Sequence, residues 1–460
     1  MFNAVLRRFL DEAPVCVAVR ATLERLLAPA WLDELFGRVA CHQYESKLLF
    51  STLSDLMSQV VCSTRRSIHE AYQHAREIGV SITSVYNKLN GLEPPLSAAL
   101  VRQSGKEAAA VMRHLTLRPA LLKGYEVRIV DGNHLTTTQH RLKELRTTRS
   151  GPLPGQSLVV FDPRRRLMVE MVPCEDAHAQ ERALIGALFE LVKGGELWMA
   201  DRNFCTTLML RGLINRGAFF LIRQHASTLY LEKGGPWRKC GACKSGTVYE
   251  QSVPVRLDLC SGREQWVTLR RIKLKLKKPT EDGDWEIHLL SNLPQSARAE
   301  KLAQLYADRW QIEDAFGELT ASLRCEINTL GYPRAALFAF ALALLAYNAV
   351  SLIKTALIQA HGGEEQVEEK ISFYQLSREV AATSRGMEVA VDGRQWKLFT
   401  AMTAQQFARW LIDLAGKTNL RRYRKHPRGP QKPYPPRTRG RRIKHVATAR
   451  ILRDRLANSG

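Results

Sequence analysis

The chain has 460 residues, of which 45% are hydrophobic and 25% charged, and its formal net charge is +23. Such a chain is long enough for about two or three domains and a large core, which excludes a small disulfide-stapled domain. Its nine cysteines are scattered without a framework, so we expect a reducing, cytoplasmic compartment. The positive charge favours a polyanion partner, with nucleic acid the leading choice and an anionic membrane surface the alternative.

Apolar residues at three- and four-residue spacing predict a helical N-terminal domain over residues 1–120. Within it, a helix over 67–78, a turn at Gly79, a capping Ser81 and a second helix over 82–89 have the outline of a helix-turn-helix. A plain helical hairpin has the same outline. If the unit binds DNA, four polar residues of its second helix face the groove: Thr83, Ser84, Asn87 and Lys88.

The pattern changes from helices to strands after Gly124. Strands are predicted over 125–130, 156–161, 167–172, 196–200 and 218–223, with helices over 177–192 and 206–216. Three strands, a helix, and then strands and helices in turn is the order of a ribonuclease-H-like α/β domain, which we expect over residues 121–355. A β-rich insertion is expected over about 225–295, where four further strands are predicted.

Three acidic residues stand at positions that suit metal-assisted chemistry. Asp131 ends the β-branched run 127–130 at a glycine turn, and Asp201 follows the apolar run 197–200. Glu313 lies on a predicted helix over 299–323, one face of which also carries Tyr306 and Arg309. Two aspartates at strand ends and a downstream helical glutamate are what a two-metal phosphoryl-transfer site needs. For the helix alone, a solvated face with an ordinary Arg309–Glu313 pair is the alternative.

These residues carry a family resemblance. The chain resembles the DDE transposases of bacterial insertion sequences, specifically the insertion-sequence-four family with its Tyr-x2-Arg-x3-Glu-x6-Lys signature. The resemblance covers residues 125–353, and more weakly the N-terminal region. The matching positions are Tyr306, Arg309 and Glu313 of the signature, Asp131 before Gly132 in the first aspartate motif, and Asp201 in Ala-Asp-Arg-Asn-Phe in the second.

The resemblance implies a cut-and-paste transposase that cuts and joins the ends of an insertion sequence by two-metal phosphoryl transfer, through a hairpin. It implies that Asp131, Asp201 and Glu313 are catalytic and hold two Mg²⁺ ions, for which Mn²⁺ can substitute. The implied partners are double-stranded DNA, as transposon ends and as target, and a second copy of the chain in a homodimeric synaptic complex. The implied location is the nucleoid of the bacterial cytoplasm.

The resemblance also implies contacts with DNA. Tyr306 and Arg309 would hold a phosphate near the cut, and Trp285 stands where the family has a tryptophan that stacks on a flipped base, a contact worth about 1–3 kcal/mol. For Trp285, an ordinary core aromatic is the alternative. The signature lysine falls at Thr320, and Arg324 is the candidate substitute. This departure favours the alternative function, a non-catalytic DNA-binding protein derived from a transposase.

Two other basic segments stand out. Four cations alternate with apolar residues in the predicted strand 265–276 and just after it, as either a phosphate track or a solvated edge: Arg271, Lys273, Lys275 and Lys277. Residues 356–460 are predicted to be a helical region with a flexible basic tail, whose segment 416–445 contains twelve basic residues and no acidic one. The apolar run 335–353 is expected to be a buried core helix, without a membrane partner.

Overall fold

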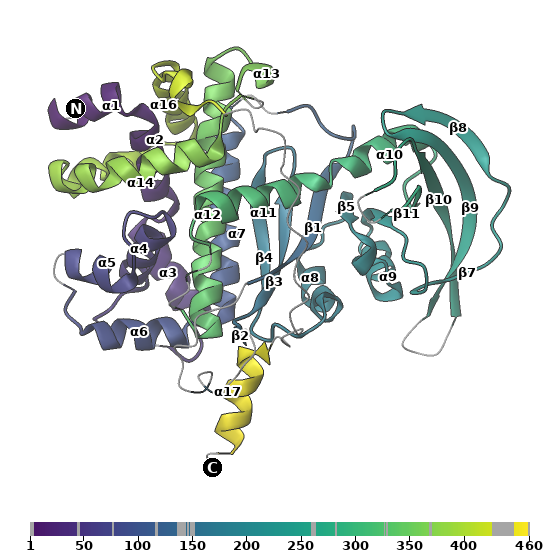
Figure 1. The fold of residues 1–460 in the computed structure, drawn as a ribbon, viewed down its shortest axis with the longest axis horizontal. Coiled ribbons are helices and arrows are strands. Elements are labelled where there is room, and N and C mark those ends of the chain that lie inside the picture. Colours follow the sequence, from purple (N-terminus) through teal and green to yellow (C-terminus); the bar gives the residue numbers. More distant parts are fainter. Residues whose placement is uncertain are drawn as a thin grey trace, which may run out of the picture.

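The structure is a computed structural model, and it describes residues 4–43, 47–75, 78–115, 118–135, 144, 147, 152–258, 264–280, 283–325, 327, 330–367, 370–425 and 446–458. A helical part and a sheet lie side by side, and the sheet extends away from the helices into long strands (Figure 1). The long helix α12 Pro333–Ala360 lies next to α7, and both of these helices pack against β4.

The N-terminal part is helical, as predicted. Prolines occupy the first positions of three of its helices, where their missing N–H costs nothing. In the expected helix-turn-helix, the first helix ends at His74, earlier than predicted, while Ser81 accepts a hydrogen bond from the Ser84 N–H and so begins the second. The helices are α1 Ala4–Glu12, α2 Pro14–Leu26, α3 Pro29–Val39, α4 Phe50–Val61, α5 Ile68–His74, α6 Ile82–Gly91 and α7 Pro94–Met112.

A mixed sheet has the strand order β4-β3-β1-β5-β6-β11-β10-β9-β7, with β8 on β9. The central strand β1 is antiparallel to β3 and parallel to β5, and β5 is parallel to β6. The strands of this half are β1 Glu126–His134, β3 Gln156–Asp162, β4 Leu167–Cys174, β5 Glu196–Ala200 and β6 Phe219–Arg223. Because β1 continues to His134, the prediction that Asp131 ends its strand at a turn is wrong; the strand pairs with β3 through this position.

The prediction of one continuous α-helix over residues 177–192 is wrong. The chain there forms two 3-10 turns around one short helix: η2 Glu181–Leu184, α8 Ile185–Leu188 and η3 Phe189–Leu191. Helix α9 Thr207–Asn215 follows β5, and the expected insertion strands then extend the sheet through β11, which pairs with β6. These strands are β7 Tyr230–Leu231, β8 Arg238–Cys243, β9 Gly246–Asp258, β10 Glu264–Leu276 and β11 Glu286–Ser291.

The predicted helix over 299–323 is interrupted. Helix α10 Ala299–Ala307 and helix α11 Trp310–Ser322 meet at Asp308 and Arg309, where backbone N–H groups bond three residues back. The Asp308 N–H donates to Leu305 O at 2.9 Å and the Arg309 N–H to Tyr306 O at 3.1 Å. In such a 3-10 turn, residues i and i+3 lie over one another, so Tyr306 and Arg309 keep a common side.

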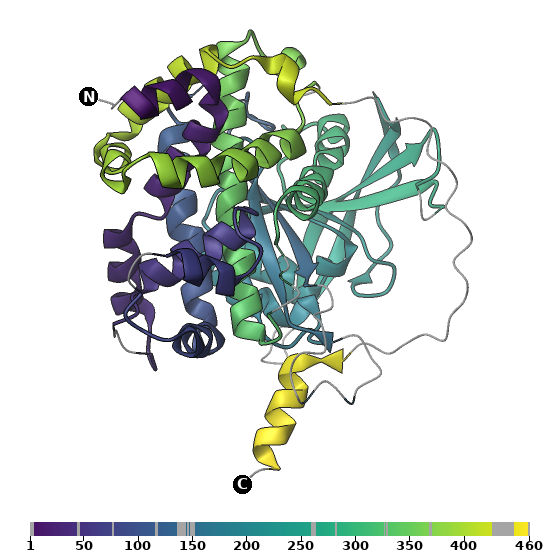
Figure 2. The same ribbon diagram turned by 60° about the vertical axis from the view of Figure 1, so that its left-hand side comes forward.

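Helix α12 Pro333–Ala360 is the buried core helix that was predicted. By length and composition alone it could span a membrane, but 94% of its most apolar window is buried inside the protein. The remaining elements are α13 Glu364–Val367, α14 Phe373–Ala390, α15 Lys397–Ala401, α16 Ala404–Gly416, β12 Val446–Ala447 and α17 Thr448–Ala457. Strand β12 pairs with β2 Pro152–Leu153, and α17 extends away from the body (Figure 2). Most of the predicted basic tail, residues 426–445, lies outside the described residues.

Candidate active site

Asp131 is a partly buried carboxylate on the central strand. Its side chain is 18% exposed, and the Gly132 N–H donates to its Oδ1 at 3.0 Å. Burial raises the pKa of the Asp131 carboxyl to about 7; Arg309 opposes the shift, and the charges of Asp201 and Glu313 add to it. Asp131 therefore lies within electrostatic reach of both other predicted catalytic residues, although β1, the end of β5 and α11 are far apart in the sequence.

Arg309 joins two of the three carboxylates. It stands at the junction of α10 and α11, where its Nη2 lies 2.6 Å from Glu313 Oε1 and its Nη1 lies 3.5 Å from Asp131 Oδ2. The side chain is 10% exposed, and its Nε is buried without a hydrogen-bond partner in the described part of the protein. The Arg309–Glu313 pair is thus not an ordinary solvated pair, because a strand carboxylate shares the same guanidinium.

Asp201 and Tyr306 meet at the end of β5. Asp201 follows the strand directly, and its Oδ1 accepts a hydrogen bond from the Asn203 N–H at 2.9 Å. Tyr306 is 7% exposed, and its hydroxyl donates to Ala200 O at 3.4 Å. Burial raises the pKa of Tyr306 to about 12, so the hydroxyl remains a donor and fixes α10 against the strand that delivers Asp201.

The site also contains a cation that the sequence analysis missed. Ala200 of β5 pairs with Ile222 of β6, so the next residues, Asp201 and Arg223, lie at the same level of two parallel strands. The positive charge of Arg223 reaches Tyr306. Arg223 also forms an ion pair with Asp284, the residue before Trp285. The one signal that could have identified Arg223 is its position at the end of a predicted strand that runs parallel to the strand before Asp201.

A fourth carboxylate, Glu181, lies beside the predicted three. A Cβ added to Gly132 would stand 1.9 Å from Glu181 Oε1, so the missing side chain of Gly132 makes room for this carboxylate. Burial raises the pKa of Glu181, and the negative charge of Asp201 adds to the shift. No spacing in the sequence marks Glu181, because it reaches the site from the 3-10 turn η2 and not from a strand end.

The donor chemistry of these residues fits a divalent cation. Carboxylate oxygens are the preferred ligands of Mg²⁺, and a partly buried aspartate whose ionised form is disfavoured gains from a nearby cation. In the geometry of the described residues, however, no group of three or more His, Cys, Asp or Glu side chains is arranged to hold a metal. Arg309 lies between Asp131 and Glu313 and neutralises them in this arrangement.

Of the residues predicted to contact DNA, Trp285 and Asn87 are exposed, whereas Lys88 is not. Trp285 is 58% exposed, so the core-aromatic alternative is wrong and the ring is free to stack. Asn87 is exposed on α6. Lys88 turns inward instead: its ammonium group donates to Leu48 O and lies 4.8 Å from the ring centroid of Phe36, so the expectation that it faces a groove is wrong.

The two residues considered for the signature lysine, Thr320 and Arg324, both bond to backbone carbonyl groups. Thr320 donates its hydroxyl to Phe316 O, within its own helix. Arg324, the candidate substitute, lies beyond the last residue of α11, and its guanidinium donates to Arg66 O at 2.9 Å. Trp310, 54% exposed at the first position of α11, was not predicted; its ring lies 5.7 Å from the Arg309 guanidinium carbon.

Comparison with known proteins gives one family match. The family described as transposase DDE domain matches residues 122–349, which contain Asp131, Asp201 and Glu313. No curated protein matches the chain. Among solved structures, the chain is similar to the piggyBac transposase in a synaptic complex with hairpin DNA, with a TM-score of 0.39 and 10% identity over 89% of this chain and 86% of that one. That likeness is too low to support any conclusion. The family match supports a DDE-type transposase and relates the chain to DNA transposition and recombination.

Proposed function

We propose that the protein is a cut-and-paste DNA transposase whose catalytic residues are Asp131, Asp201 and Glu313. The observation that carries the proposal is the convergence of these carboxylates from three distant elements: Asp131 and Glu313 share the buried guanidinium of Arg309, and the charge of Asp201 acts on Asp131. Carboxylates that lie close together in a partly buried site repel one another, and such a grouping is typical of a site that binds a cation. The family match over the same residues agrees with this assignment.

In this proposal the acidic residues bind metal ions, Arg309 binds phosphate, and Tyr306 positions the helix. Asp131, Asp201 and Glu313, with Glu181 beside them, would hold two Mg²⁺ or Mn²⁺ ions. When bound, such ions activate the attacking oxygen and stabilise the leaving one. Arg309 would hold a phosphate near the cut, as the fork of its guanidinium suits two phosphate oxygens. Tyr306 keeps α10, the helix before the one that carries Glu313, against the end of β5 that leads into Asp201.

Cleavage would proceed by in-line displacement. Water attacks the phosphate at the transposon end, the bond to O3′ breaks, and a free 3′-hydroxyl remains. That hydroxyl attacks the opposite strand and releases the flanking DNA, leaving a hairpin, which a second water reopens before the end joins target DNA. The exposed Trp285, next to the Asp284–Arg223 pair, would stack on a base that leaves the duplex at this stage.

The finer assignments form part of the same proposal. The order β4-β3-β1-β5-β6, with β1 antiparallel to β3 and parallel to β5, supports a ribonuclease-H-like core. We assign the chain to the insertion-sequence-four family, with a helical domain over 1–120, a catalytic domain over 121–355 and a C-terminal region over 356–460. A homodimer on paired DNA ends, in a bacterial cytoplasm, completes the proposal.

A nicking assay tests the chemistry. The substrate is a labelled duplex carrying the terminal inverted repeat that flanks the gene, incubated with Mg²⁺ or with EDTA. The wild type should nick it only with Mg²⁺, while Asp131→Ala and Glu313→Ala should bind the duplex and leave it intact. Asp314→Asn, which changes an exposed acid next to Glu313, is the control and should cut normally. Cutting by either alanine variant would remove that residue from the mechanism.

One observation favours a second candidate, a DNA-binding protein derived from a transposase but without catalysis. Thr320 stands at the signature lysine and bonds within its own helix, and Arg324 is turned to Arg66. Wild-type protein that binds element ends tightly and never nicks them in Mg²⁺ or Mn²⁺ would establish this candidate. If so, Thr320→Lys is the substitution expected to restore cutting.

A further inference from the structure

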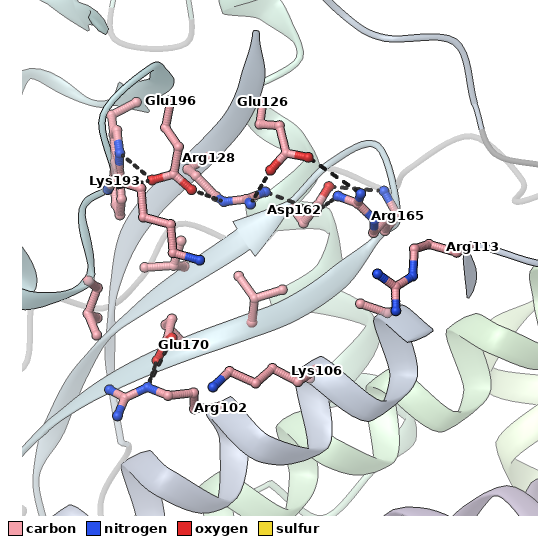
Figure 3. A pocket seen from close by; sticks show the side chains of 16 residues that line it. Arg102, Lys106, Arg113, Glu126, Arg128, Asp162, Arg165, Glu170, Lys193 and Glu196 are labelled. Carbon is pink, nitrogen blue, oxygen red and sulfur yellow. Dashed lines mark hydrogen bonds and ion pairs between the residues drawn. The ribbon is translucent and has the colours of Figure 1, made fainter. Parts of the chain in front are cut away.

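A second cluster of charged side chains lines a cavity with a volume of about 340 Å³ (Figure 3). None of the carboxylates of the candidate active site lines this cavity. Its walls are α7, the starts of β1 and β5, and parts of β3 and β4. Successive side chains of a strand point to opposite faces of a sheet, so Arg128, which lines the cavity, points away from the face of Asp131. The cavity is therefore separate from the candidate active site, although both use β1.

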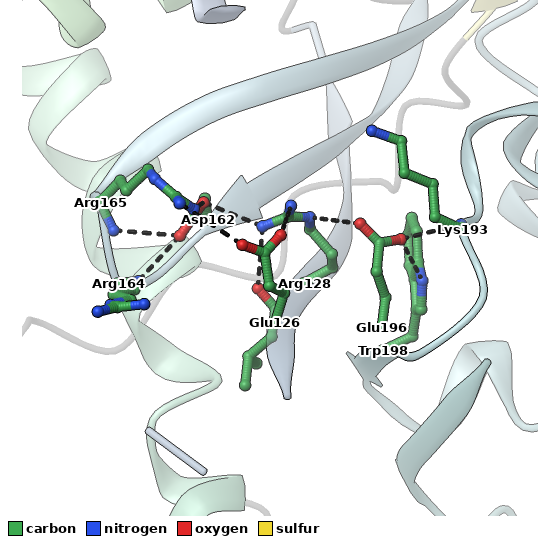
Figure 4. A network of polar contacts seen from close by, with 9 residues as sticks. Glu126, Arg128, Asp162, Arg164, Arg165, Lys193, Glu196 and Trp198 are labelled. Atoms are coloured by element: carbon green, nitrogen blue, oxygen red, sulfur yellow. Dashed lines mark hydrogen bonds and ion pairs between the residues drawn. The ribbon is translucent and has the colours of Figure 1, made fainter. Parts of the chain in front are cut away.

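The acidic side chains of this cavity are already paired. Arg128 contacts Glu126 and Asp162 at 2.9 Å and Glu196 at 3.1 Å, and Arg165 contacts Asp162 at 2.7 Å. Figure 4 shows this chain of contacts across the starts of β1 and β5. Asp162 and Glu196 are only 3% and 7% exposed, so their charges are committed to these arginines.

Three further cations have no such partner. The side chains of Lys106, Arg113 and Lys193 form no hydrogen bond or ion pair with the described residues, and Figure 3 shows them around the same cavity. Lys106 and Arg113 come from α7, while Lys193 comes from the segment before β5. The lining has six basic and four acidic side chains, a formal charge of +2.

Both lysines act electrostatically on one carboxylate that is already paired with an arginine. The single Nε–H of Arg102 is shared between the two oxygens of Glu170, at 3.0 Å from Oε1 and 2.8 Å from Oε2. Burial raises the pKa of Glu170; Arg102 opposes that shift most strongly, and the charges of Lys106 and Lys193 add to the opposition without an ion pair. One acid thus faces three cations brought by two elements.

The position of Lys193 is set by the same network. Its backbone N–H donates to Glu196 Oε2 at 3.0 Å, and Glu196 is held by Arg128 and by the Trp198 Nε1–H. On the other wall, Gly105 lets α7 approach β4, because an added Cβ would lie 3.2 Å from Met168 O. The walls that carry the unpaired cations are therefore fixed in place, and the cavity is prepared for a negative ligand.

We propose that this cavity binds an anion through its phosphate groups, with Lys106, Arg113 and Lys193 as the ligand-binding cations. Ammonium and guanidinium groups are the side chains that hold phosphate oxygens, and the cavity volume falls within the range of small-ligand sites. The phosphate belongs either to a small free anion or to the backbone of bound DNA, and two measurements distinguish these sources.

The test compares the wild type with the double variant Lys106→Ala/Lys193→Ala. The control, Lys397→Ala/Arg409→Ala, removes the same charge from two exposed residues outside the cavity. All residues changed are exposed, so folding should be unaffected, which a thermal melt verifies. The first measurement is calorimetric titration with inorganic pyrophosphate in EDTA. The second is the salt dependence of binding to a random duplex without element ends.

A small-anion site requires that pyrophosphate bind the wild type and the control and bind the cavity variant at least tenfold more weakly. A DNA-backbone site requires that pyrophosphate bind the wild type, the control and the cavity variant equally. In that case the slope of the logarithm of the DNA-binding constant against the logarithm of the salt concentration should become smaller in magnitude by about 1.8 in the cavity variant alone, because each of the two lost phosphate contacts removes about 0.9. If the cavity variant matches the control in both measurements, the proposal is overturned. Neither measurement needs DNA cleavage, so the result is independent of the proposed catalytic function.

Discussion

Replacing Arg309 with methionine removes the guanidinium that Asp131 and Glu313 share. The two ion pairs are 2.6 and 3.5 Å long, and the arginine side chain is 10% exposed. Removing one partner of a buried pair costs about 3–5 kcal/mol, and because Glu313 is 34% exposed we expect about 3 kcal/mol, the low end of that range. The loss arises because two carboxylates then face one another without a counter-charge.

A divalent cation should compensate for this loss. In the variant, Mg²⁺ no longer competes with a guanidinium for the two carboxylates, and a ligand at 100 times its Kd stabilises the folded state by about 2.7 kcal/mol. The assay is urea unfolding followed by tryptophan fluorescence, in EDTA and in Mg²⁺, with Arg394→Met as the control for an exposed pair. The reasoning is refuted if Arg309→Met is as stable as the control in EDTA, or if Mg²⁺ stabilises it no more than the wild type.

Three further changes test other parts of the molecule. Asn348→Ala leaves the buried N–H and C=O of Met168 without their 2.8 Å partners, which should lower the free energy of unfolding by about 2–4 kcal/mol in urea; a loss below 1 kcal/mol would contradict this. Gly132→Ala should displace Glu181 and slow Mg²⁺-dependent nicking while end binding persists, and an unchanged nicking rate would show that Glu181 is dispensable. Trp285→Ala should leave the melting temperature unchanged and reduce hairpin formation after the first nick; normal hairpin yield would rule out the stacking role.

The parts of the fold that sequence patterns predicted well have sharp local boundaries. Strand β5 begins and ends where predicted, because Gly194 and Gly195 precede its apolar run and Asp201 follows it. Ser81 was recognised as a cap because its side chain bonds the Ser84 N–H only three residues away. In both cases the residues that decide the structure are neighbours in the chain.

The parts that were predicted wrongly depend on contacts between distant segments. No glycine or proline marks the junction at Arg309; its side chain is held there by Asp131, which lies on a strand far earlier in the chain. Glu181 could not be found for the same reason, because the space it fills is created by Gly132. The inward turn of Lys88 depends on Phe36 and Leu48, which periodicity along α6 does not reveal.

The two charged sites of this protein are connected through β1. Arg128 holds Glu196 across the β1–β5 pair, at a register where Glu126 lies opposite Glu196 and Ile129 opposite Met199. Because the strands are parallel, this pairing also fixes how far Asp131 and Asp201 extend beyond the last matched residues. The arginine network at the start of the strands therefore contributes to the spacing of the carboxylates that follow. Alternation of side chains along one strand lets β1 serve two faces at once, with Arg128 of the paired network on one face and Asp131, the proposed catalytic acid, on the other.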